Sequence, residues 1–434
     1  MPVRLATTDS DFAARFEALL ATKREAAEDV DRAAADIIES VRRDGDAALI
    51  ELSRRFDAVD LAATGLAVTR QEIAAAHAAC APADLEALAF AAARIRAFHE
   101  KQRPADQRWT DALGVELGWR WSAIEAVGLY VPGGTASYPS SVLMNAIPAK
   151  VAGVRRLVMT VPAPRGELSP LVLAAADLAG VDEIYRVGGA QAVAALAYGT
   201  NTIRPVAKIV GPGNAFVAAA KRRVFGTVGI DMIAGPSEVV VMADASANPD
   251  WIAADLLAQA EHDAAAQSIL VADDAALAAA VERALEAQLA ALPRRAVAAA
   301  SWRDFGAIIL VPELADAAPL VDRLAPEHLE IVTADAEALA ARVTNAGAIF
   351  LGAHTPEAIG DYVGGSNHVL PTARSARFAS GLGVLDFLKR TSLLKCDAQA
   401  LAALAPAAIA LGRAEGLDAH ARSVAIRTNR GPAA

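Results

Sequence analysis

The sequence predicts an α/β fold made of two Rossmann-like parallel-sheet lobes that lack the usual glycine fingerprint, with helical segments at both ends. Two observations lead to this prediction. Between residues 127 and 351, short β-rich runs alternate with helical patterns, which is typical of parallel sheets covered by helices. The β-rich runs also fall into two series that meet near Ser237, which indicates two lobes.

The first hundred residues have a helical pattern. Apolar residues recur at helical spacing over 30–41, and Gly45 stands where a C-terminal cap belongs. Thr69 and Glu72 have the spacing of a capping box at the start of the next helix. A third helix is expected over residues 83–103.

The expected strands come next along the chain. Those of the first lobe cover residues 127–131, 157–161, 183–187 and 207–210, and those of the second lobe cover residues 238–242, 268–272, 307–311, 330–333 and 348–351. From Gly381 onward the pattern becomes helical again.

These patterns predict four segments. They are an N-terminal helical arm (residues 1–25), a larger discontinuous α/β lobe (26–129 with 237–380), a second α/β lobe (130–236) and a C-terminal helical segment (381–434). Binding sites in such sheets are expected at the carboxyl ends of strands and between lobes.

Composition excludes several classes of protein. The chain has 434 residues, 54% of them apolar, which is too apolar for a disordered chain. Its net charge of -10 argues against general nucleic-acid binding, and two cysteines exclude a disulfide framework or a four-thiolate zinc site. Asp9 and Asp11 interrupt any signal peptide, and the longest apolar run is too short to span a bilayer, so we expect a soluble cytoplasmic protein.

Glycine-rich turns follow three of the expected strands, at residues 131–134, 187–189 and 210–214. The dinucleotide fingerprint is absent, because Phe216 stands where a third glycine belongs. Glycine in such turns lets backbone amides approach a phosphate at a helix N-terminus. Each turn alone is more often ordinary β-to-α geometry, but three in one lobe favour a ligand.

Two pairs of polar residues are candidates for chemistry in the second lobe. Gln259 and His262 share a helix face and suit a metal by type, although a solvated surface pair is the commoner arrangement. Glu327 and His328 come directly before an expected strand, and histidine carries protons near neutral pH. The alternative for this second pair is a capping glutamate beside a half-buried histidine.

Two further groups lie nearer the C-terminus. Asp361 and His368 flank a glycine-containing loop and are candidate ligands or substrate contacts, the alternative being a turn stabilised by polar side chains. Glu415 and His420 are five residues apart, so they do not share one helical face, and the pattern alone indicates a solvated helix surface.

Long stretches of the sequence resemble bacterial L-histidinol dehydrogenases. The resemblance covers nearly the whole chain, and its strings are much more specific than any single motif above. The stretches that carry it are residues 127–134, 138–149, 229–239, 257–262, 325–329, 361–371 and 381–384.

This resemblance implies the four-electron oxidation of L-histidinol to L-histidine through histidinal, the last step of histidine biosynthesis, with two NAD⁺ reduced and one zinc per subunit. It places the metal and catalytic residues in the larger lobe and the NAD contacts in the lobe of residues 130–236. Position by position, it implies that zinc is bound by Gln259, His262, Asp361 and His420 and that Glu327 and His328 are the catalytic pair. It implies that NAD is contacted by Tyr130, Gln191 and Asn214. The substrate would be contacted by Ser237, His368 and Glu415 and also by His328 and the four zinc ligands.

The same resemblance implies a homodimer in which Glu415 and His420 of the C-terminal segment reach the partner's active site. The residue types suit the chemistry, because alcohol oxidation needs a base and the intermediate aldehyde must add water. His328 would be the base, and Glu327 would activate the water.

Three other functions fit parts of the pattern. A paralogue that oxidises a sulfonated diol has a substrate without imidazole, whereas His368 and Glu415 keep the histidinol pattern. A zinc hydrolase would use Glu327 to activate water and would need no NAD. A non-catalytic metal- or nucleotide-binding protein would lack the base and the water activator, and both are present.

Overall fold

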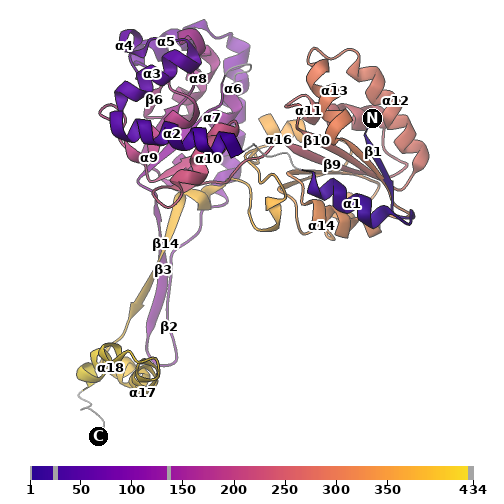
Figure 1. The fold of residues 1–434 in the computed structure, drawn as a ribbon. Coiled ribbons are helices and arrows are strands. Elements are labelled where there is room, and N and C mark those ends of the chain that lie inside the picture. The colour runs from indigo at the N-terminus through magenta and orange to yellow at the C-terminus, as the bar shows by residue number, and fades with distance from the viewer. Residues whose placement is uncertain (1, 23–27, 134–137, 429–434) are drawn as a thin grey trace. The chain divides into compact units, whose positions relative to one another are not determined.

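The computed structural model describes residues 2–22, 28–133 and 138–428. It divides into two compact units, one made of residues 1–102 with 125–386 and the other of residues 103–124 with 387–434. The first unit contains two parallel β-sheets and their helices, so the predicted α/β fold with two parallel-sheet lobes is confirmed (Figure 1). We refer to these as the six-stranded lobe and the five-stranded lobe.

The six-stranded lobe is a fully parallel sheet in the order β1-β11-β10-β9-β12-β13. Its strands are β1 (Val3–Ala6), β9 (Glu238–Ala243), β10 (Gln267–Ala272), β11 (Ala307–Leu310), β12 (His328–Val332) and β13 (Ala348–Leu351). The five strands predicted for this lobe are confirmed. The N-terminal arm of residues 1–25 was expected to be helical, but it also contains the strand β1. Val3 in this strand pairs with Ala307 at the sheet edge.

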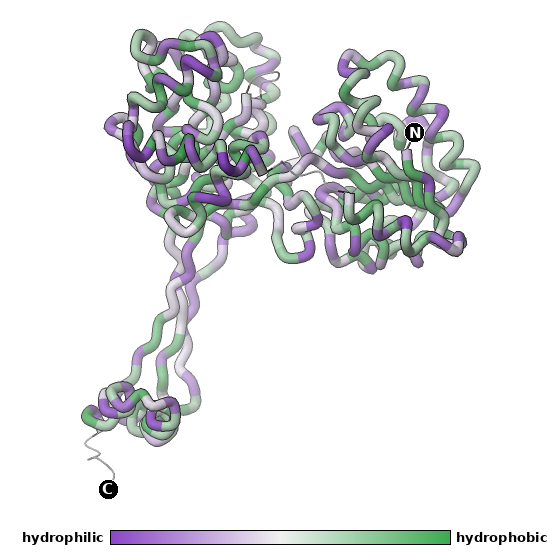
Figure 2. The backbone as a smooth tube through the Cα atoms, viewed as in Figure 1, coloured by the Kyte–Doolittle hydropathy of each residue, from purple (hydrophilic) through white to green (hydrophobic). Residues whose placement is uncertain are grey.

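Helices cover both faces of this sheet. They are α1 (Phe12–Ala21), α11 (Pro249–Ala260), α12 (Ala275–Leu289), α13 (Arg295–Phe305), α14 (Ala318–Leu324), α15 (Ala336–Ala340) and α16 (Glu357–Tyr362). On β9, Val239 and Val241 pack with α11, α12 and α13, whereas Val240 and Met242 pack with α1 and α14. Such two-sided burial requires apolar residues at nearly every position, as the hydrophobic colour of these strands in Figure 2 shows.

The five-stranded lobe is also fully parallel, in the order β6-β5-β4-β7-β8. Its strands are β4 (Ala126–Tyr130), β5 (Arg156–Thr160), β6 (Glu183–Tyr185), β7 (Lys208–Val210) and β8 (Gly229–Ile230). Its crossover helices are α7 (Pro139–Ala152), α8 (Pro170–Ala179), α9 (Gly189–Tyr198) and α10 (Ala215–Val224). The four predicted strands are confirmed, and β8 was missed because a two-residue strand has no readable period.

The N-terminal helices α2 (Glu28–Asp44), α3 (Asp46–Asp57), α4 (Leu61–Thr64), α5 (Arg70–Ala79) and α6 (Pro82–Glu100) pack on the five-stranded lobe. Ala34 and Val41 of α2 share one core with Val193 of α9. This differs from the expected grouping of residues 26–129 with 237–380, because periodicity reveals an apolar face but not the sheet that covers it. The capping box is confirmed, since the Thr69 amide donates to Glu72 Oε2 at 2.8 Å and the Glu72 amide donates to Thr69 Oγ1 at 3.2 Å.

The second compact unit joins two distant parts of the sequence. An antiparallel sheet in the order β14-β3-β2 contains β2 (Gln107–Thr110), β3 (Glu116–Ala123) and β14 (Leu388–Lys395), and it leads to α17 (Ala398–Ala414) and α18 (Asp418–Ala425) (Figure 1). The segment 381–434 is therefore not wholly helical. β14 was missed because none of its residues is buried, so no alternation marks it.

Short 3₁₀ turns complete the described secondary structure, at Pro164–Gly166, Leu314–Ala317, Ser375–Arg377, Val384–Phe387 and Ile426–Thr428. Among the described residues, no single helix has the length and apolar character needed to cross a membrane, although α5 and α6, which meet at a sharp bend, satisfy that test as a pair.

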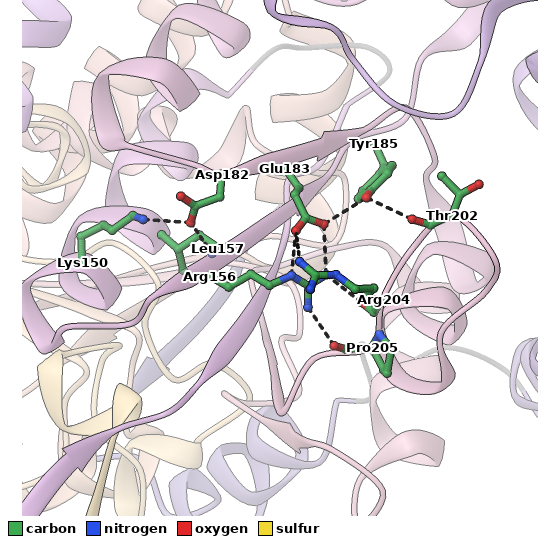
Figure 3. Close-up of polar contacts among 9 residues, drawn as sticks. All are labelled: Lys150, Arg156, Leu157, Asp182, Glu183, Tyr185, Thr202, Arg204 and Pro205. Atoms are coloured by element: carbon green, nitrogen blue, oxygen red, sulfur yellow. Dashed lines mark hydrogen bonds and ion pairs between the residues drawn. The ribbon is translucent and has the colours of Figure 1, made fainter.

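Glu183, the first residue of the edge strand β6, is the centre of a polar network in the five-stranded lobe (Figure 3). Glu183 accepts two hydrogen bonds from Arg156, at 2.8 and 3.0 Å, one from Arg204 at 2.9 Å and one from the Tyr185 hydroxyl at 3.0 Å. The Arg156 guanidinium, with help from Arg204 and Tyr185, lowers the pKa of Glu183 from 4.5 to about 2. The charged carboxylate therefore stabilises the folded state.

This shift predicts a pH-dependent contribution to stability. Because the pKa of Glu183 is lower in the folded state, its contribution is complete above about pH 4.5 and is lost as the pH falls toward about 2. We expect Glu183→Gln to lower the free energy of unfolding by about 1 kcal/mol at neutral pH, since the partly exposed pair is screened by solvent. Urea unfolding at several pH values measures the difference in the free energy of unfolding between the wild type and Glu183→Gln. This difference should become smaller in acid, and a difference that does not depend on pH would contradict the prediction.

Candidate active site

Glu327 and His328 lie at the amino edge of the six-stranded sheet. Glu327 immediately precedes β12, His328 is the first residue of that strand, and the neighbouring strand β9 begins at Glu238. Both side chains are buried, with residue exposures of 6% and 5%. The predicted position directly before a strand is confirmed for Glu327, whereas His328 already belongs to β12, and this edge is opposite to the carboxyl edge where sites in parallel sheets are expected.

The hydrogen bonds of His328 determine its neutral tautomer. Its Nδ1 lies 2.9 Å from the main-chain carbonyl oxygen of Glu238, and a carbonyl only accepts, so Nδ1 carries the proton. The other ring nitrogen, Nε2, is buried without a hydrogen-bond partner and lies 3.7 Å from Asp361 Oδ1. A neutral His328 therefore has a free lone pair at Nε2, as a general base requires.

Carboxyl groups surround the imidazole of His328. Glu327 Oε2 and Glu357 Oε2 lie 3.6 and 3.7 Å from Nδ1, and Glu327 also accepts a hydrogen bond from the Glu238 amide at 2.9 Å. Burial raises the pKa of Glu327 to about 7 and that of Glu357 to about 8. Burial alone would lower the pKa of His328, but Glu327, Glu357 and Asp361 outweigh it and hold this pKa well above 6.5. Glu327 and Glu357 therefore exchange protons near neutral pH, whereas the surrounding carboxyl groups favour the charged form of His328, which must release its Nε2 proton before it acts as a base.

Three of the four expected zinc ligands lie in the first compact unit. Gln259 is in the last turn of α11, His262 follows that helix, and Asp361 is in α16. Burial lowers the pKa of His262 despite the nearby charge of Asp361. Although burial raises it, the pKa of Asp361 stays below its usual value because of His328, His368 and His262. A neutral imidazole and an ionised carboxylate are donors that suit zinc.

The amide of Gln259 is held by hydrogen bonds to neighbouring residues. Its buried amide fits best with the nitrogen toward Glu357, at 2.9 and 3.2 Å, and the oxygen accepting from the Glu238 amide at 3.0 Å. Within the described residues, no three His, Cys, Asp or Glu side chains form a metal-binding group. His262 and Asp361 are the expected ligands of those types in the first unit, and the amide oxygen of Gln259 keeps a second lone pair for a metal.

The expected substrate contacts are distributed over both units. His368 Nδ1 lies 2.9 Å from the Asp361 carbonyl oxygen, and its Nε2 lies 3.2 Å from Ser141 Oγ. Burial lowers the pKa of His368, so the ring favours its neutral form. Ser237 is half-buried directly before β9. Glu415 and His420 are exposed residues of the second unit, at the end of α17 and within α18.

The expected NAD contacts lie at the carboxyl edge of the five-stranded sheet. Tyr130 ends β4, Gln191 is in the first turn of α9, and Asn214 caps α10 by accepting from two amides of its first turn at 3.1 and 3.2 Å. The Gly189 amide donates to the Tyr130 hydroxyl at 3.1 Å, and burial raises the pKa of that hydroxyl to about 12. This is the edge at which sheets of this type bind nucleotides. Position 134 of the first glycine-rich turn lies outside the described residues.

Sequence reasoning missed Glu357, Glu238 and Ser141. The only available signal was the four-residue spacing of Glu357 and Asp361, which places them on one helix face. The other two contact the site through strand pairing and helix packing that no local pattern reveals.

Two parallel-sheet lobes, with a buried imidazole–carboxyl cluster at the edge of one, define an α/β enzyme of the acid–base type. The family described as histidinol dehydrogenase matches residues 20–428. The histidinol dehydrogenases of Mesorhizobium japonicum and Rhodopseudomonas palustris are 69% and 70% identical to this chain, over 99% of its length and 100% of theirs. The crystal structure of histidinol dehydrogenase from Elizabethkingia anophelis matches with a TM-score of 0.94 and 34% identity, over 99% of this chain and 98% of that one. The chain therefore belongs to the histidinol dehydrogenase family, which confirms the resemblance.

Proposed function

We propose that this oxidoreductase converts L-histidinol to L-histidine through histidinal and reduces two NAD⁺, as the last step of histidine biosynthesis. The observation that carries the proposal is the buried His328, whose Nε2 is free and which lies beside Glu327, in a chain of this family. The site residues discussed below are assigned as part of the same proposal.

In the first oxidation, His328 Nε2 takes the proton of the substrate hydroxyl. Its Nδ1–H stays bonded to the Glu238 carbonyl, so the ring keeps its orientation as it becomes charged. The carbon then loses a hydride, and the C–O bond becomes the carbonyl of histidinal. Tyr130, Gln191 and Asn214 would hold the NAD⁺ that would supply the acceptor for that hydride.

In the second oxidation, Glu327 takes a proton from water as the water oxygen adds to the aldehyde carbon, and His328 gives the proton that it took in the first oxidation to the carbonyl oxygen. Only the resulting hydrate has a hydride to release from that carbon. His328, neutral again, then takes a hydroxyl proton of the hydrate while the second hydride leaves, and the carboxylic acid that forms releases its remaining proton to water and becomes the carboxylate. A pKa of about 7 suits Glu327 for this exchange near neutral pH.

Zinc fits the same residues. Gln259, His262 and Asp361, completed by the partner's His420, would hold one zinc per subunit. When bound, zinc orients the imidazole and amine of the substrate. Ser237, His368 and Glu415 would contact the substrate directly, and the neutral ring of His368 suits a hydrogen bond to a cationic amine or an imidazole.

We further propose a homodimer with shared active sites, in which Glu415 and His420 serve the partner's site. Their exposure in the second unit supports this assignment, because both side chains are free to contact another subunit. We propose a cytoplasmic enzyme without a nucleic-acid or membrane partner, in keeping with the net charge of -10.

The proposal is tested by the amount of NADH formed from limiting L-histidinol with excess NAD⁺. We expect two moles of NADH per mole of histidinol, loss of activity on chelation and recovery with added zinc. One mole of NADH with histidinal released would contradict the four-electron reaction. No NADH from histidinol, with NADH from a sulfonated diol or with hydrolysis of another substrate, would replace the proposed function by one of the alternatives.

A further inference from the structure

A buried ion pair underlies the loop between β7 and α10. Lys221 on α10 and Asp231, which follows β8, contact each other through their charged atoms, and their side chains are only 2% and 1% exposed. Taking two charges out of water requires that the remaining donors and acceptors be satisfied. Here the two side chains satisfy each other and also bind both main-chain polar groups of one residue of the loop.

That residue is Gly211. Lys221 Nζ donates to the Gly211 carbonyl oxygen at 2.9 Å, and the Gly211 amide donates to Asp231 Oδ2 at 2.7 Å. The ion pair therefore holds both polar groups of a single residue.

Gly211 lies close to the main chain at the end of β4. Its φ of +109° lies in the region that favours glycine, and a Cβ atom there would come within 2.1 Å of the Tyr130 carbonyl oxygen. Three residues later, Asn214 caps α10. The position of Gly211 thus influences how Tyr130 and Asn214 lie relative to each other. These two residues are the NAD contacts proposed for β4 and α10.

Stability alone is a weak reason to keep a buried ion pair, since a matched apolar pair is often as stable. The Arg156–Glu183 pair provides a comparison in the same lobe (Figure 3). Its side chains are 15% and 22% exposed, and Arg156 binds the carbonyls of Arg204 and Pro205, away from the expected NAD contacts.

We propose that Lys221 and Asp231 are positioning residues for NAD⁺ binding, because they hold Gly211 so that residues 211–214 and Tyr130 meet the diphosphate of the dinucleotide in a fixed geometry. This inference rests on the proposed function. Lys221 acts through Gly211 and does not itself contact the diphosphate, since its side chain is only 2% exposed and its ammonium group bonds to Asp231 and to the Gly211 carbonyl beneath the loop.

The test removes both charges together, so that no unpaired charge remains buried. In Lys221→Met/Asp231→Leu both bonds to Gly211 are lost, whereas in Lys221→Met/Asp231→Asn an oxygen remains that accepts from the Gly211 amide. The matched control is Arg156→Met/Glu183→Leu. Calorimetric titration with NAD⁺, the KM for each substrate and kcat are measured for all three, with circular dichroism and thermal unfolding as folding checks.

We expect Lys221→Met/Asp231→Leu to raise the Kd and KM for NAD⁺ about tenfold. The loop of residues 211–214 is no longer held in the free protein, so part of the binding free energy is used to order it. The KM for histidinol and kcat should change less than about threefold, the Asn variant should recover part of the affinity, and the control should bind NAD⁺ like the wild type. A folded Leu or Asn variant with wild-type affinity for NAD⁺ would overturn the inference, as would equal weakening in the control. Failure of the wild-type protein to bind NAD⁺ would instead overturn the proposed function.

Discussion

Replacing His328 by Asn is expected to lower kcat for histidinol oxidation by about 10²- to 10⁴-fold. Asn can still donate to the Glu238 carbonyl, as Nδ1 does at 2.9 Å, but it has no basic nitrogen in place of Nε2. The Kd for NAD⁺ should stay unchanged, because the proposed NAD contacts lie on the other sheet. Stopped-flow NADH formation from histidinol and, separately, from histidinal measures both half-reactions.

The matched variant is Glu327→Gln, which keeps the size of the side chain and the acceptor for the Glu238 amide. It should slow the oxidation of histidinal much more than that of histidinol, because only histidinal must first add water. His328→Asn should slow both. Equal losses in the two half-reactions of Glu327→Gln would contradict the separate roles of the two residues.

Mixing two inactive variants is expected to recover about one quarter of the wild-type activity if Glu415 and His420 serve the partner's site. Co-expression of His328→Asn with His420→Asn gives hybrid dimers in which one site carries both changes and the other carries neither. Random pairing makes half of the dimers hybrids, and half of their sites are intact. The specific activity of the unselected mixture measures this recovery, and differently tagged chains verify that hybrids have formed; hybrids purified through both tags should reach about one half.

The matched control combines His328→Asn with Glu327→Gln, whose changes always fall in the site of their own chain. Every site in that mixture is damaged, so the rate of histidine formation should not rise above that of the two variants measured separately. Verified hybrids of the first mixture that also remain inactive would refute the shared sites.

The sequence was most informative where a feature is local. The capping box of Thr69, the main strands of both lobes and the adjacent Glu327 and His328 all follow from short-range patterns. The partners of an apolar face are not local, so the packing of α2 on the five-stranded lobe and the pairing of β14 with β3 were not predicted.

The site shows the same division. Glu357 reaches His328 only because α16 folds against the amino edge of the sheet, and its pKa of about 8 results from burial that periodicity does not report. The expected roles of Gln259, Asp361 and His420 came from resemblance to a family, since a spacing of about a hundred residues has no physical meaning before the chain is folded. Folding brings Asp361 within 3.7 Å of His328 Nε2.

The orienting acceptor of His328 is a main-chain carbonyl and not a carboxylate side chain. No substitution of the Glu238 side chain removes that carbonyl, so the tautomer of the base is protected against point mutation in a way that a histidine oriented by an aspartate is not. The orientation depends instead on the hydrogen-bonded register of β9 and β12. Fraying at the amino end of these two strands would thus release the imidazole and reduce activity before the lobe unfolds.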